Sequence, residues 1–119
     1  MILRNLGRSF YYALSGIVQA FLRERNMKIH AIMITIVVII GCSFHITSGE
    51  WLAIILTIGL VVGLEMINTA VEALVDLVTE EYKYLAAVAK NVAAGAVLIA
   101  AIVAVIVAIV VFLPYVKAF

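Results

Sequence analysis

The stretch AAGAVLIAAIVAVIVAIVVFL, residues 93–113, decides the fold class of this chain. It contains 21 consecutive residues without a charge. An α-helix needs about 20 apolar residues to cross the ~30 Å hydrocarbon core of a bilayer. We therefore predict a membrane-spanning helix at about residues 90–114.

Two further apolar runs precede this stretch. Residues 29–46 form an 18-residue run, and residues 51–64 form a 14-residue run that ends at Glu65. Fourteen residues are few for a complete span, so the second helix is expected to continue through a polar segment. The sequence thus predicts an all-α integral membrane protein with a single domain. This domain covers residues 1–119. Its transmembrane helices are predicted at about 29–46, 51–78 and 90–114.

The segment before the first apolar run is amphipathic. Its apolar side chains recur every three or four residues, as Leu6, Phe10, Leu14, Ile17 or Val18, and Phe21. Its polar side chains occupy most of the remaining surface, as Arg4, Arg8, Ser15, Gln19 and Arg23. Such a helix is suited to lying in the plane of the lipid headgroups. We predict a surface helix at about residues 5–25; the alternative is a fourth short helix buried in the bundle.

The composition agrees with an integral membrane protein. Hydrophobic residues make up 67% of the 119 residues and charged residues 13%, whereas a soluble domain has roughly 45–50% apolar residues. The net charge of +1, with no basic tail, does not indicate nucleic-acid binding. A single cysteine, Cys42, excludes an intrachain disulfide and is interpreted as a packing residue. No cleavable signal peptide is expected within residues 1–25.

The basic residues predict the orientation of the chain in the membrane. Seven of them precede the first span or lie between the second and third: Arg4, Arg8, Arg23, Arg25, Lys28, Lys83 and Lys90. The connection at 45–50 contains no Lys or Arg, and Lys117 alone follows the third span. Cytoplasmic loops carry the excess of basic residues. We therefore expect a multi-pass protein of the bacterial cytoplasmic membrane, with its N-terminus and the 79–91 connection cytoplasmic and its C-terminus outside.

Four polar side chains share one face of the second predicted span, in the segment EMINTAVEALVD at 65–76. At ~100° per residue they lie at roughly 0°, −60°, −20° and +20° around the helix. These residues are Glu65, Asn68, Glu72 and Asp76. A carboxylate at bilayer depth costs at least ~2.5 kcal/mol. Three of them on one face therefore require a cation, a basic group or water.

We expect three polar clusters at the same membrane interface. The first is Glu24 to His30 (ERNMKIH), the second is the stripe formed by the four residues at 65–76, and the third is Lys90 with Asn91. Carboxylates on different helices beside a lysine suit a Mg²⁺–polyphosphate, and a further carboxylate can act as a general base. The sequence has no Walker A or GxGxxG motif, which excludes the common soluble nucleotide folds. Spacing alone leaves two alternatives open, a proton or cation relay in a small transporter and a structural helix end that projects into water.

Three segments of the chain resemble the prokaryotic diacylglycerol kinase family, and most closely its undecaprenol kinase branch. They are SFYYALSGIVQAFLRERNMKIH (9–30), GLEMINTAVEALVDLVTEEY (63–82) and LAAVAKNVAAGAVLIAA (85–101). The resemblance implies a homotrimer with active sites shared between subunits. It also implies transfer of the γ-phosphate of ATP, with Mg²⁺, to the membrane lipid alcohol undecaprenol. Diacylglycerol is the alternative acceptor. The alternatives from other classes are a small cation or drug transporter and a nucleotide-binding protein of low turnover.

The resemblance also implies roles for individual residues of the stripe and of the first cluster. Glu65 matches the general base that accepts the proton of the lipid hydroxyl. Glu24 and Glu72 match carboxylates that bind the metal ions on the ATP phosphates. Asn68 matches a residue near the γ-phosphate that helps to position the base and the transferring group.

The third cluster departs from the family pattern at one position. Asp76 matches a polar position of the nucleotide pocket, and Lys90 matches a lysine that contacts a nucleotide phosphate. The family usually reads AKD where this chain has Asn91 after Lys90, so a charge is removed from the ATP pocket. We expect lowered but nonzero kinase activity, whether Asn91 is a natural variant or an introduced substitution. The alternative is that Asn91 only caps the third helix.

Overall fold

The computed structural model describes residues 2–119, with side chains from residue 5 onward, and is helical apart from short connections over that range. Met1 lies outside the described part. So does the side chain of Arg4, which is among the residues that predict the polar face of the surface helix and the orientation of the chain. The helices are α1 (Ile2–Arg23), α2 (Arg25–Phe44), α3 (Ser48–Val78) and α4 (Tyr84–Lys117). Helices α2, α3 and α4 are long and apolar enough to cross a membrane. The predicted all-α membrane fold is confirmed.

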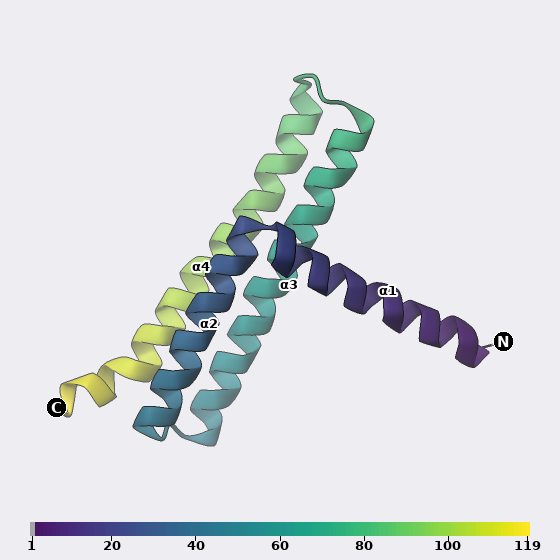
Figure 1. Cartoon of the computed structure of the whole chain (residues 1–119). Helices are drawn as coiled ribbons and strands as arrows, with labels where there is room; N and C mark the ends of the chain where they lie inside the picture. The colour runs from purple at the N-terminus through teal and green to yellow at the C-terminus, as the bar shows by residue number, and fades with distance from the viewer. Residues whose placement is uncertain (1) are drawn as a thin grey trace.

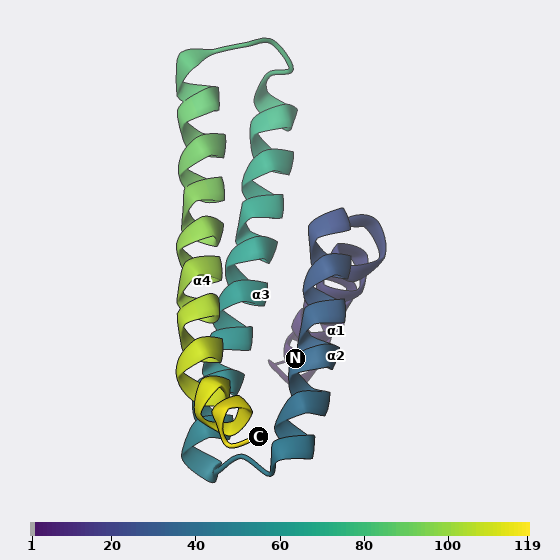
Figure 2. The ribbon, with the colours of Figure 1, turned by 90° about the vertical axis from the view of Figure 1, so that its left-hand side faces the viewer.

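Helices α3 and α4 form a long antiparallel hairpin, and α2 runs along only one half of it (Figures 1 and 2). Helix α2 has 20 residues and α3 has 31. At 1.5 Å per residue they are about 30 Å and 46 Å long. Since α2 ends where α3 begins, α3 extends roughly 16 Å past the first residue of α2. The length of α2 is close to the thickness of the bilayer core, so a membrane that α2 just spans would leave the far end of the hairpin outside its core.

A single residue separates α1 from α2. Glu24 has φ −90° and ψ 124°, an extended conformation between two helices. The chain changes direction there, and α1 runs sideways away from the bundle (Figure 1). Leu6, Phe10 and Leu14 of its apolar face are exposed in the single chain. The other helices of the chain thus leave the apolar face of α1 uncovered, which suits a helix in the headgroup plane.

The connection between α2 and α3 is fixed by two helix caps. His45 has a left-handed φ of 52°, and the amides of His45 and Ile46 donate to the carbonyls of Cys42 and Gly41. This pair of bonds is a Schellman motif. Thr47 and Glu50 then form a capping box at the start of α3, with N–H···O distances of 3.2 Å and 2.9 Å. Backbone groups at both helix ends are thereby satisfied.

A cluster of buried hydrophobic residues lies at this same end of the molecule. Ile46, Ile54 and Val111 are its buried members, and aromatic side chains, Phe44, Trp51, Phe112 and Tyr115, pack around it. The Tyr115 hydroxyl donates to the Glu50 carboxylate, which joins the end of α4 to the start of α3. Most other apolar side chains of the described helices are exposed. They are available to lipid or to other copies of the chain.

Candidate active site

Glu65 is buried at the level where α2 begins. Its residue exposure is 2%, and its partners come from the first turns of α2. The Asn26 side-chain amide donates to Glu65 Oε1 at 3.4 Å, and His30 Nε2 lies 3.7 Å from Glu65 Oε2. The first and second polar clusters predicted from the sequence therefore meet at this carboxylate.

Asn68 lies one turn further along α3 and is also buried, with an exposure of 6%. Its amide nitrogen donates to Glu72 Oε1 at 3.2 Å, within the same helix. Its carbonyl oxygen Oδ1 is buried and has no hydrogen-bond partner. A buried acceptor without a partner is costly in a folded protein, so this oxygen is a candidate contact for a ligand.

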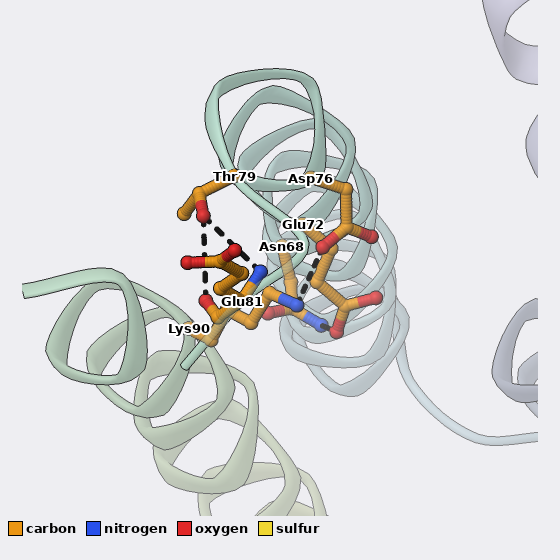
Figure 3. Close-up of polar contacts among 6 residues, drawn as sticks. All are labelled: Asn68, Glu72, Asp76, Thr79, Glu81 and Lys90. Carbon is orange, nitrogen blue, oxygen red and sulfur yellow. Dashed lines mark hydrogen bonds and ion pairs between the residues drawn. The ribbon is translucent and has the colours of Figure 1, made fainter. Parts of the chain in front are cut away.

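Asp76 and Lys90 connect α3 to α4 near the far end of the hairpin (Figure 3). Lys90 Nζ lies 2.7 Å from Asp76 Oδ1. The two side chains are 41% and 56% exposed, so the pair is open to solvent. In Figure 3 the side chains of Asn68, Glu72 and Asp76 follow one side of α3. The second and third predicted clusters therefore also meet.

The connection from α3 to α4 begins beside this pair. Thr79 ends α3, and its hydroxyl accepts the amide of Glu81 at 3.1 Å. Helix α4 begins at Tyr84 after Lys83, six residues before the predicted transmembrane span. Asn91 is therefore inside α4 and exposed, and the alternative that it caps this helix is wrong.

The side chains of Glu24 and Asn91 make no hydrogen bond or ion pair with the other predicted site residues in the described part of the chain. The position of Glu24 bears on the metal site. This residue is partly exposed at the junction of α1 and α2. Among the described residues there is no group of three or more His, Cys, Asp or Glu side chains that could hold a metal ion. Glu24 and Glu72 therefore do not form a complete metal site within one chain.

The oxygens near Asn68 nevertheless fit Mg²⁺. This ion prefers hard oxygen ligands and is usually held by one or two carboxylates together with substrate phosphates and water. Glu72 is exposed and the Asn68 Oδ1 atom lacks a partner. These two residues offer the protein part of such a coordination shell, and phosphate oxygens would supply the remainder.

Two adjoining cavities lie near the start of α2. One, of about 320 Å³, is an open cleft lined by α2, α3 and α4, and nearly all of its lining residues are apolar. The other, of about 280 Å³, is lined by Glu65, Asn26, His30 and apolar residues of α2 and α4. Ile29, His30 and Ala101 line both. This pair of cavities suits a ligand with an apolar chain and a single hydroxyl group. The apolar cavity suits the chain, and the cavity at Glu65 suits the hydroxyl.

Sequence reasoning placed Asn26 and His30 in the first cluster but did not assign them to Glu65. Their spacing of four residues puts them on one face of a helix. That signal was present in the sequence. Which face of α2 turns toward α3 depends on packing, and periodicity alone does not provide it.

The chain matches known proteins along most of its length. The model of the prokaryotic diacylglycerol kinase family matches residues 11–112. The undecaprenol kinase of Bacillus subtilis is 39% identical over 112 residues, covering 94% of this chain and 91% of that protein. The diacylglycerol kinase of Synechocystis sp. is 44% identical over 92% of this chain, which spans 63% of that protein. The diacylglycerol kinase of Escherichia coli K12 is 34% identical over 75% of this chain and 73% of that protein.

The fold, the polar face and these relatives together define a multi-pass membrane kinase that acts on lipids. The chain belongs to the prokaryotic diacylglycerol kinase family. ATP and a lipid alcohol are accordingly its substrates. Family membership favours the kinase over the transporter that the polar stripe alone left open.

Proposed function

We propose that this chain phosphorylates undecaprenol with ATP at the cytoplasmic face of the bacterial membrane. The observation that carries the proposal is the buried Glu65 carboxylate, which lines a small cavity adjoining the apolar one, at the level where α2 begins. The 39% identity to an undecaprenol kinase over 94% of the chain supports this acceptor. The 44% identity to a diacylglycerol kinase supports diacylglycerol as the alternative.

The proposed chemistry is a direct in-line transfer. The lipid hydroxyl oxygen attacks the γ-phosphorus of ATP and forms the new P–O bond, while the bond from that phosphorus to the β–γ bridging oxygen breaks. The hydroxyl proton passes to the Glu65 carboxylate, and ADP leaves with the electron pair of the broken bond. A buried carboxylate within reach of the hydroxyl is suited to this general-base role.

The other polar residues of the face contact the nucleotide in this proposal. Asn68 lies beside the transferring phosphoryl group, with its unpartnered Oδ1 available to the Mg²⁺ that the phosphates would carry, and Lys90 neutralises phosphate charge beside Asp76. Glu72, with Glu24, holds Mg²⁺, which when bound offsets negative charge on the phosphates. Asn91 follows Lys90 in α4 and is exposed, and we propose that it contributes to the same nucleotide end of the site.

We further propose a homotrimer with active sites shared between subunits. The spanning helices expose most of their apolar surface in the single chain, which leaves faces available for other copies. Glu24 makes no hydrogen bond or ion pair with the stripe within the described chain, so a neighbouring subunit is a natural source of the Glu24 that completes a site. Basic residues favour a cytoplasmic N-terminus. Reporter fusions at each end of the chain test that orientation.

The acceptor is tested with purified protein in lipid, Mg-ATP and either undecaprenol or diacylglycerol. We expect phosphate transfer to undecaprenol at the higher kcat/KM. A higher kcat/KM for diacylglycerol would replace the proposed acceptor by the alternative. Phosphorylation of neither lipid, by this chain and by its Asn91→Asp variant, would remove the kinase proposal.

The role of Glu65 is tested by Glu65→Gln, which keeps the size of the side chain and removes its basicity. General-base catalysis contributes roughly 10²–10⁴-fold, so we expect turnover to fall by at least about 100-fold with ATP binding retained. The matched control is Glu80→Gln, in the exposed connection after α3, which should keep the activity of the unmodified chain. Full activity of Glu65→Gln would reject its role as the base.

A further inference from the structure

Two side chains of α2 hold the Glu65 carboxylate from one side. The Asn26 amide meets Oε1 at 3.4 Å and His30 Nε2 lies 3.7 Å from Oε2. Each carboxylate oxygen thus has its own partner on α2. Residues four apart on a helix lie on the same face, so a single face of α2 presents both groups to α3.

The remaining surroundings of this carboxylate are apolar. Helix α4 contributes Ala94, Val97, Leu98 and Ala101 to the cavity at Glu65. Among the described residues that line this cavity, Asn26 and His30 are the polar neighbours of Glu65. A carboxylate in such surroundings depends on these two groups for its orientation, because a buried charged group without partners is costly.

The two contacts leave room for a third. An ionised carboxylate offers about four lone-pair sites. Asn26 uses one site on Oε1 and His30 uses one site on Oε2, so two sites remain. The His30 distance is longer than an ordinary hydrogen bond of 2.7–3.2 Å. Contacts of catalytic groups commonly tighten when substrate binds, and a movement of the ring by less than about 1 Å makes this contact a hydrogen bond.

His30 also marks the place where the two cavities adjoin. It lines the apolar cavity between α2, α3 and α4 as well as the smaller one at Glu65. A lipid alcohol whose chain occupies the apolar cavity brings its hydroxyl past His30 to reach the carboxylate. The side chain of His30 is 20% exposed, so it borders the path and is not sealed in the core.

We infer that His30, assisted by Asn26, is a positioning residue that fixes the Glu65 carboxylate in the orientation that accepts the hydroxyl proton. This inference rests on the proposed kinase function. In it, His30 holds Oε2 and Asn26 holds Oε1, and the free lone pairs point into the cavity where the acceptor hydroxyl arrives. Neither side chain takes the proton itself.

The experiment compares His30→Leu, His30→Gln and His45→Asn in the full-length protein. Leu keeps the bulk without a donor, and Gln restores a donor at similar reach. His45→Asn is the matched control, because His45 is exposed at the other end of α2 and Asn tolerates its left-handed φ of 52°. Each variant is assayed for kcat and for KM of ATP and lipid.

We expect His30→Leu to lower kcat about 10- to 100-fold, in line with the effect of displacing a catalytic group by about 1 Å. KM for ATP should stay within about twofold, because the nucleotide end of the site is not altered. His30→Gln should recover most of the lost kcat, and His45→Asn should match the unmodified chain. Asn26→Ala should give a smaller loss, about threefold, since its contact is long and neutral. Equal losses in His30→Leu and His30→Gln, or no loss in either, would overturn the inference.

A second readout separates this inference from the kinase proposal. The infrared band of the Glu65 carboxylate is assigned as the difference between the unmodified chain and Glu65→Gln. We expect His30→Leu to shift this band, while His30→Gln and His45→Asn leave it in place. An unchanged band in His30→Leu contradicts the contact, whichever lipid the protein phosphorylates. A shifted band with no phosphorylation of any lipid supports the contact and removes the proposed function instead.

Discussion

Lys90 and Asn91 are neighbours in α4 but have different surroundings. Lys90 is held by Asp76 at 2.7 Å across the hairpin, while Asn91 is exposed. An ion pair that is this open to solvent contributes little to stability. Lys90 can therefore exchange Asp76 for a phosphate oxygen at small cost. In the proposed kinase, Asp76 keeps the lysine extended toward the nucleotide before ATP arrives.

Asn91 lacks the negative charge that an aspartate would bring to this position. Asn91→Asp should raise kcat/KM for ATP about threefold to tenfold, because hydrogen bonds to charged groups are stronger than neutral ones. Steady-state kinetics at varied ATP concentration measures the change. Asn5→Asp in exposed α1 makes the same chemical change away from the site and should have no effect. Unchanged kinetics in Asn91→Asp would show that this position does not contribute to nucleotide binding.

The contact between α2 and α3 opposite the active-site end depends on a glycine. A Cβ atom added at Gly41 would lie 2.7 Å from Trp51 Cη2, whereas one added at Gly49 would meet nothing within 4 Å. A contact of 2.7 Å forces the indole ring or the helix to move. The absence of a side chain at Gly41 thus allows α2 to approach the first turn of α3.

Gly41→Ala is therefore expected to destabilise the protein by about 1–3 kcal/mol, the usual range for overpacking a core. Denaturant or thermal unfolding in detergent, followed by circular dichroism, measures the change. Gly49→Ala serves as the control and should unfold like the unmodified chain. The kcat of Gly41→Ala at low temperature should change little, because Glu65 lies at the other end of α2. Equal stability of the two variants would mean that Trp51 has an alternative position.

The arrangement of helices was largely predictable from the sequence, whereas their contacts were not. Hydropathy identifies the stretch that must lie in lipid, so it predicted three spanning helices and an amphipathic one. Hydropathy does not register how far a helix continues into water. Helix α4 accordingly begins at Tyr84, before the apolar stretch. The spacing of the stripe predicted that Glu65, Asn68, Glu72 and Asp76 share a face, but not that Asn26 and His30 turn toward Glu65.

At the scale of the whole molecule, one chain is too sparsely packed to account for the proposed site. The described chain measures 54 Å along its longest axis and 21 Å along its shortest. Its cluster of buried hydrophobic residues lies at the end opposite the polar stripe, while Met27 and Ala100 are buried outside that cluster. The proposed trimer would both cover the apolar faces and bring Glu24 of one subunit to the stripe of another.

Sharing of active sites is tested by mixing two inactive variants. Glu24→Gln and Glu65→Gln should each be nearly inactive alone. If a site takes these residues from different subunits, a mixed trimer contains a site with both carboxylates and should regain measurable activity. Native mass spectrometry verifies the mixed trimers. Mixed trimers without activity would place Glu24 and Glu65 of each site in the same chain, and a monomeric mass would reject the trimer.

The length of α2 has a consequence for the membranes in which this protein can work. An extra residue in α2 between His30 and the Schellman motif would raise the start of α2 by about 1.5 Å and rotate Asn26 and His30 by about 100° away from Glu65. Insertions of four or seven residues restore the facing to within about 40° or 20°, and these add about 6 Å or 10 Å. Small adjustments of α2 to a thicker bilayer are therefore incompatible with the geometry at Glu65. Hydrophobic mismatch between α2 and the surrounding lipid would act directly on the proton acceptor, so activity should be sensitive to lipid chain length.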